Sequence, residues 1–239
     1  MAMDFVPTAA DFNARRVTNP SQSEVVRQRF YDYQLYATAG TSQLTFFSAP
    51  VGQGLTTALG GTAGTAKTLW DTNLELPNTL PSGKAFMIES IEVIFFPGSV
   101  STANTYTLAS PVAFSTTGAA TQAAQLADVN SFYQSGMLEL NVLSKNYLRE
   151  TPMIAFPPKT NFNLDVAVAS AGTNAQPSGF ALMNGRVSGR PYYISPEIAL
   201  QPAVNFEVVI KFPAAVATPS GFNARVGVIL DGYFMRASQ

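Results

Sequence analysis

The stretch FEVVIKFPAAVATPSGFNARVGVILDGYFM, residues 206–235, decides the fold class. In its first part Phe206, Val208 and Ile210 alternate with more polar neighbours, which is the period-two pattern of a half-buried strand. Pro, Ser and Gly residues then interrupt the run, as turns require, and a second apolar run follows over residues 226–235. The simplest prediction is that these two strands pair as antiparallel neighbours. We expect the second one to lie inside its sheet.

The remainder of the chain repeats this kind of material. Short runs rich in β-branched and aromatic residues are separated by turn residues, and no long amphipathic helix is apparent. Strands are expected at residues 30–37, 44–49, 86–96, 138–142, 147–150 and 162–168, with weaker candidates at 70–76, 105–108, 112–115 and 180–183. Single helical turns are expected near 23–28 and 126–133. Residues 184–204, which contain three prolines, are expected to form an irregular crossing.

This pattern predicts an all-β fold, an antiparallel β-sandwich of jelly-roll type with an extended N-terminal arm. Strands separated by long crossing connections are what Greek-key and jelly-roll topologies need. A single jelly roll is preferred. A compact double jelly roll stays open as the alternative, because IEVIFFP at residues 91–97 resembles FEVVIKFP at residues 206–213.

The expected organisation is an N-terminal arm over residues 1–29 followed by one β-sandwich domain over residues 30–239. The arm and the first strand supply the candidate subunit-contact residues, which are Arg15, Arg16, Arg27, Arg29, Tyr31 and Tyr33. Asp4, Asp11 and Glu24 balance most of the positive charge of the arm. A genome-binding arm should be far more basic, so direct nucleic-acid binding is expected to be weak or absent.

Composition restricts the chemistry that the chain can perform. Only 12% of its residues are charged, against roughly 25% in ordinary soluble domains. Because a free monomer usually stays soluble by displaying charge, this favours a surface covered by other copies of the chain. The chain has no Cys and no His, which removes thiolate chemistry and the commonest general base and metal ligand. We therefore expect no enzyme, no cofactor and no metal site.

The remaining chemical motifs have plain structural interpretations. In the loop GTAGTAKT, residues 61–68, Ala66 stands where a phosphate loop requires Gly before Lys. Glu139 and Asp165 lie on the polar faces of alternating strands, where solvated carboxylates belong. Glu89 and Glu92 have opposite strand parity, so they are not expected to share a face as a catalytic pair.

Targeting signals are not evident in the sequence. The N-terminus lacks the basic start and apolar core of a signal peptide. The uncharged run over residues 93–127 is interrupted by Pro, Gly and Asn, so it does not resemble a membrane span. We expect the protein to be made in a cytoplasm and to stay soluble there.

Three segments carry a family resemblance, namely LPSGKAFMIESIEVIFFPG (80–98), GMLELNVLSKNYLRETP (136–152) and residues 206–239. With the uncharged Ser/Thr/Ala-rich body, they resemble a small jelly-roll major capsid protein of a tailless icosahedral bacteriophage. The resemblance implies a structural virion protein that self-assembles as trimers or pentamers in the host cytoplasm, with arms joining neighbours and minor virion proteins as further partners. Such proteins carry no catalytic residues. The nearly neutral arm departs from the basic arms of genome-binding members.

Two other classes of function stay open at this point. A virion spike or lectin-like β-sandwich would bind a glycan or receptor through the loops at residues 52–68 and 99–127. A hydrolase using only Asp and Glu residues would also be compatible with the absence of His and Cys.

Overall fold

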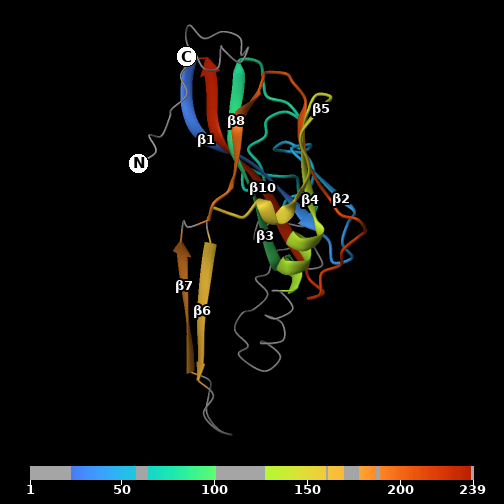
Figure 1. Ribbon diagram of the computed structural model, residues 1–239, viewed down its shortest axis with the longest axis vertical. Coiled ribbons are helices and arrows are strands. Elements are labelled where there is room, and N and C mark those ends of the chain that lie inside the picture. The colour runs from blue at the N-terminus through green and yellow to red at the C-terminus, as the bar shows by residue number, and fades with distance from the viewer. Residues whose placement is uncertain are drawn as a thin grey trace.

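The computed structural model describes residues 23–57, 64–100, 127–159, 161–169, 178–186 and 189–237. In these ranges the chain is mostly β, with a helix over residues 127–135 and a 3-10 turn, η1, at Met153–Ala155 (Figure 1). The strands are β1 Ser23–Tyr36, β2 Gln43–Phe46, β3 Lys84–Val100, β4 Met137–Val142, β5 Lys145–Pro152, β6 Asn161–Ala169, β7 Ser178–Arg186, β8 Tyr192–Leu200, β9 Phe206–Lys211 and β10 Asn223–Ala237.

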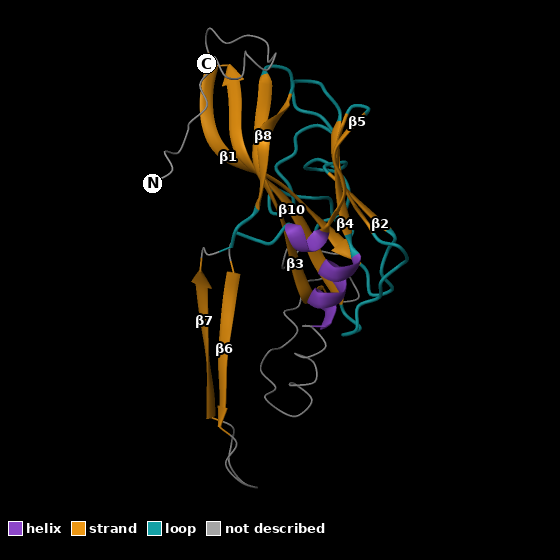
Figure 2. Ribbon diagram, viewed as in Figure 1, coloured by secondary structure: helices purple, strands orange, loops and turns teal. Residues whose placement is uncertain are grey.

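Eight of these strands form two four-stranded antiparallel sheets. Sheet 1 has the order β1-β10-β3-β8, and sheet 2 has the order β2-β9-β4-β5. Strands β6 and β7 pair only with each other among the described strands, as a hairpin that extends away from both sheets (Figure 2). The prediction of an all-β antiparallel sandwich is confirmed at this level.

One hydrophobic core lies between the two sheets. Phe30 of β1 stacks on Phe47 with ring centroids 5.0 Å apart, and it also contacts Phe206 of β9 at 5.8 Å. Val226, Val228 and Leu230 of β10 all belong to this core, as the period-two pattern predicts. Aromatic side chains from both sheets therefore hold the layers together.

The two strands predicted within residues 206–235 are not neighbours, which corrects the sequence prediction. β9 lies between β2 and β4 in sheet 2, whereas β10 lies between β1 and β3 in sheet 1. The connection over residues 212–222 is longer than the two to five residues of a usual hairpin, and it crosses from one layer to the other. The expectation that the last strand lies inside its sheet is confirmed.

Four further expectations differ from the structure. Strand β1 begins at Ser23, so residues 23–29 are paired with β10 and form neither a helical turn nor part of a free arm. Residues 192–200 form edge strand β8 where an irregular crossing was expected, because an edge strand accommodates Pro196 at a register shift. Residues 70–76 make only isolated bridges instead of a strand. Strand β5 begins at Lys145, two residues before the expected start at residue 147, because the turn at residues 143–144 is short.

Other expectations have a simpler outcome. The helical turn expected near residues 126–133 is confirmed by the helix at 127–135. The strand candidates at 105–108 and 112–115, and residues 1–22 of the arm, lie outside the described residues.

Candidate functional site

The face of sheet 1 that points away from sheet 2 carries a group of charged side chains that we call the outer ionic cluster. Its members are Arg27, Arg29, Glu89, Glu92, Lys159 and Asp231. The Arg27 guanidinium lies 3.2 Å from Glu89 Oε2 and 3.4 Å from Asp231 Oδ2. Arg29 Nη1 lies 3.9 Å from Glu92 Oε1. Both arginine side chains are close to half exposed, while Glu92 and Asp231 are buried.

Asp231 is the centre of this cluster. Lys159 Nζ lies 3.1 Å from Asp231 Oδ2, on the same oxygen that faces Arg27. Burial acts to raise the pKa of Asp231, but the hydrogen bond and charge of Lys159 and the charge of Arg27 outweigh it, so the pKa falls below its usual value. The carboxylate therefore stays ionised, and the cluster acts as a fixed set of compensated charges.

The structure corrects the expectation that Glu89 and Glu92 lie on different faces. In the pairing of β3 with β10, Asp231 is opposite Ser90 and Gly232 is opposite Ile88, so Glu89 is the extra residue of a β-bulge. The bulge breaks the alternation, and the carboxylate of Glu89 reaches the Arg27 guanidinium that also contacts Asp231. Strand parity could not reveal this, because the bulge is set by the neighbouring strands.

Tyr31 and Tyr33 of β1 lie on the same face and hold the loop between β2 and β3. The Tyr31 hydroxyl donates a hydrogen bond to the Leu69 carbonyl. The Arg225 guanidinium lies 3.8 Å from the centre of the Tyr33 ring, in cation–π geometry. A Cβ at Gly227 would come within 2.2 Å of the Tyr33 ring, so glycine is required for this stack. Both tyrosines are therefore used within one copy of the chain.

Sequence reasoning missed a buried ion pair beneath this loop. Lys67 Nζ lies 2.6 Å from Asp32 Oδ1, and both side chains are buried. The other carboxylate oxygen of Asp32 accepts a 2.7 Å hydrogen bond from the backbone N–H of Phe47. Asp32 shares strand parity with Phe30 and Tyr36, which face the core. The sequence did contain a signal for this pair, because Asp32 falls on the apolar face of an aromatic-rich strand, where a carboxylate needs a buried partner.

Asp71 is the second buried acid of the same loop. Its carboxylate accepts hydrogen bonds from the hydroxyls of Thr56 and Thr57, each at 2.7 Å, and from the backbone N–H of Thr68 at 3.0 Å. Burial acts to raise the pKa of Asp71, but the hydrogen bonds from Thr57, Thr68 and Thr56 lower it below the usual value. Asp32 and Asp71 thus fix the loop against β1.

The fixed loop exposes an apolar corner beside β1. The side chain of Trp70, the single tryptophan of the chain, is 79% exposed, and its neighbour Leu69 is 67% exposed. Their backbone is held in place, because the Leu69 carbonyl accepts from Tyr31 and the Trp70 carbonyl accepts from Arg225 at 2.7 Å. Large apolar side chains that are exposed on a backbone held in place are typical of contact surfaces.

The opposite open side of the sandwich lies between the edge strands β5 and β8. Tyr147 of β5 and Tyr193 of β8 are exposed there, and both line a broad depression of about 640 Å³. The two open sides are thus bordered by different exposed aromatic residues, Trp70 on one side and Tyr147 and Tyr193 on the other.

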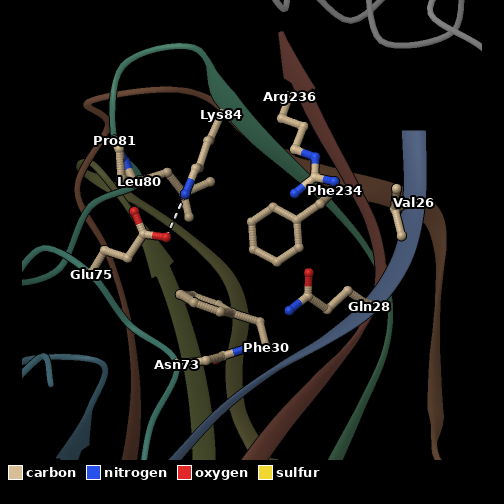
Figure 3. Close-up of a pocket in the computed structure, with 10 residues that line it drawn as sticks. All are labelled: Val26, Gln28, Phe30, Asn73, Glu75, Leu80, Pro81, Lys84, Phe234 and Arg236. Atoms are coloured by element: carbon tan, nitrogen blue, oxygen red, sulfur yellow. Dashed lines mark hydrogen bonds and ion pairs between the residues drawn. The ribbon is translucent and has the colours of Figure 1, made fainter. Parts of the chain in front are cut away.

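A smaller hollow lies at the end of the sandwich where β1 begins (Figure 3). It has a volume of about 180 Å³ and lies between β1, the β2–β3 loop and the adjoining ends of β3 and β10. Its apolar wall is formed by Val26, Phe30, Leu80 and Phe234. Its rim carries two ion pairs, Lys84 with Glu75 and Arg236 with Glu24.

Of the six residues predicted as subunit contacts, four lie in the described part of the chain and two do not. Arg27, Arg29, Tyr31 and Tyr33 lie together on the outer face of β1, while Arg15 and Arg16 lie outside the described residues. Among the carboxylates considered for hydrolysis, Glu139 is buried and its Oε2 lies 2.7 Å from Lys211 Nζ. Asp165 lies in β6, whose side chains are outside the description.

Within the described residues, no group of three or more acidic, His or Cys side chains is placed to hold a metal ion. The described part of the chain also contains no helix with the length and apolarity needed to cross a membrane. A scan against protein-family models found no match, and searches of the curated proteins and of the solved structures found none either.

Proposed function

We propose that the chain is a single jelly roll, with β6 and β7 inserted as a hairpin between its fifth and sixth strands, β5 and β8. The observation that carries this proposal is the nesting of strand pairs. The first strand pairs with the last (β1 with β10), β2 with β9, β3 with β8, and β4 with its successor β5. A chain folded back on itself and rolled into two sheets gives this order, with two Greek keys.

On this fold we propose a structural shell protein that assembles with copies of itself into the icosahedral capsid of a tailless phage. The low content of charged residues supports this, since such a surface is better suited to burial against siblings than to free solution. The exposure of Leu69 and Trp70 on a hydrogen-bonded backbone supports it further. The jelly roll also occurs in lectins and cupins, so the exposed surfaces carry this argument and the fold alone does not.

The two open sides suggest how copies would meet. The side with Trp70 differs from the side with Tyr147 and Tyr193, so a contact between them is heterologous and joins copies head to tail. Heterologous contacts close into rings when the rotation allows, which gives the trimers or pentamers of a shell. The outer ionic cluster, which is compensated within one copy, would lie next to this contact through Arg27 and Arg29.

The test is electron microscopy and sedimentation of the expressed protein over a range of concentrations. We expect rings or closed shells, with the sedimentation coefficient rising with concentration. A protein that stays monomeric at high concentration would contradict the proposal, and glycan binding by that monomer would favour the lectin-like alternative.

A further inference from the structure

The hollow in Figure 3 lies beside an unpaired length of β1. The backbone groups of odd-numbered β1 residues point away from β10. The Arg29 carbonyl accepts from Asn73 Nδ2 at 2.8 Å, the Tyr31 N–H donates to Asn73 Oδ1 at 3.0 Å, and the Tyr33 N–H donates to the Asp71 carbonyl at 2.8 Å. The loop thus covers this edge from Arg29 onward.

Nearer its start the same edge is open among the described residues. The β1–β10 register runs without a shift from Ser23 to Tyr36, so Val25 and Arg27 direct their N–H and C=O groups outward as Tyr31 does. No described residue pairs with them, and Val26 and Arg27 are exposed. An open strand edge is a template for an added strand.

The side chains beside this edge match an added strand. Val26, Gln28 and Phe30 alternate along β1 and all line the hollow, while Arg27 and Arg29 point to the outer face. At about 180 Å³ the hollow is below the roughly 300–1,000 Å³ of small-molecule sites. A strand added at this edge would instead place one large side chain into the hollow and backbone groups against β1.

We propose that the open edge of β1 and the hollow bind Met3–Val6 from the N-terminal segment of a second copy, which rests on the proposed assembly function. The 16 residues between Val6 and the start of β1 can span at most roughly 55 Å when extended, enough to reach a neighbour. Within them, Asp4-Phe5-Val6-Pro7 joins an acid to a short apolar run.

An antiparallel register satisfies each position. With Val6 opposite Val25, Phe5 lies opposite Val26 and enters the hollow towards Phe30 and Phe234. Asp4 then lies opposite Arg27, whose guanidinium is near half exposed on the outer face. Pro7 falls where its nitrogen points away from β1, so the missing N–H costs no hydrogen bond.

Disulfide trapping tests this register, and the absence of native cysteine makes the chain suited to it. Met3 would lie opposite Gln28 in a non-hydrogen-bonded pair, with Cα atoms roughly 4.5 Å apart, which suits a disulfide. Differently tagged Met3→Cys and Gln28→Cys chains are mixed, assembled and oxidised. We expect a disulfide between the two tagged chains as the main product.

Two controls make the result specific. Pairing Met3→Cys with Leu143→Cys, at a highly exposed residue in the β4–β5 turn, should give little disulfide. Adding Phe5→Ser to the Met3→Cys chain should lower the Gln28 disulfide roughly tenfold, because the apolar side chain no longer fills the hollow.

Each outcome separates this proposal from the proposed function. If Met3→Cys gives equal disulfide yields with Gln28→Cys and with Leu143→Cys, the proposed docking is wrong. If shells are seen in the same sample, the proposed shell function is still supported. A double variant Met3→Cys/Gln28→Cys diluted in excess wild-type chain reports on docking within one copy. An intramolecular disulfide as its main product would overturn the exchange between copies.

Discussion

At the scale of single residues, the most consequential feature is the pairing of two buried charges under the β2–β3 loop. Burial raises the pKa of Asp32, and the charge and hydrogen bond of Lys67 oppose that rise. A buried charge is tolerated only when its partner and hydrogen bonds are in place. Lys67 and the Phe47 N–H meet this requirement for Asp32.

Replacing Lys67 by Met should therefore destabilise the fold strongly. Removing one partner of a buried pair leaves an uncompensated charge and costs about 3–5 kcal/mol. The matched control is Lys84→Met, whose partner Glu75 is exposed, and it should cost no more than about 1 kcal/mol. Urea denaturation gives both free energies of unfolding. Equal losses for the two variants would contradict this account of Asp32.

Asp71 gives a prediction about pH. Its pKa in the folded protein lies below the usual 3.8, so the folded state binds the proton less readily than the unfolded state does. The stabilisation by Asp71 is therefore present above about pH 4 and is lost as pH falls through the lower, folded pKa. We expect Asp71→Asn to cost about 2 kcal/mol at pH 7 and progressively less as pH falls below 4. A cost that does not change between pH 7 and pH 3 in denaturation experiments would refute it.

At the scale of elements, most strands could be predicted from the sequence, but their partners could not. Period-two patterns located β4, β9 and β10 within a few residues, because alternation reflects burial of one face. The β-branched and aromatic content of residues 86–96 located β3. Pairing depends on where remote strands lie, so the closeness of β9 and β10 in the sequence was misleading.

For the candidate site, too, the residues could be predicted from the sequence but their contact partners could not. Arg27, Arg29, Tyr31 and Tyr33 were found because charged and aromatic residues near the start of the chain are visible in any sequence. Their true partners, such as Asp231 and Arg225, lie about 200 residues away and depend on the pairing of β1 with β10.

The open edge of β1 leads to a prediction for hydrogen exchange at single amides. In unassembled protein the N–H groups of Val26 and Gln28, which face β10, should exchange slowly, while those of Val25 and Arg27 should exchange quickly. Amide exchange followed by NMR would measure this alternation. Uniform protection from residue 24 to residue 28 before assembly would show that the edge is already covered.

At the scale of the whole molecule, the two open sides of the sandwich differ in their exposed side chains. Trp70 stands on one side, Tyr147 and Tyr193 on the other. A single tryptophan at a proposed contact makes assembly visible by fluorescence without any label.

We expect the emission of Trp70 to shift to shorter wavelength on assembly, because the indole moves from water into a contact. As a control, Leu143→Trp in a Trp70→Phe background places the indole in the exposed β4–β5 turn, outside the lining of the depression between β5 and β8, and should keep its long-wavelength emission. An unchanged Trp70 spectrum in assembled particles would place the contact elsewhere.

The pairing of β1 with β10 also has a consequence for synthesis on the ribosome. Strand β1 is translated before β10 and has no partner there until roughly 200 more residues have been added, a delay of roughly 10–40 seconds at ordinary elongation rates. During that interval the apolar side chains of a nascent β1 lack part of the core that later buries them, which favours transient non-native contacts. A prematurely terminated product lacks β10, the strand that joins β1 to β3, so it could not complete the sandwich that the proposed shell requires.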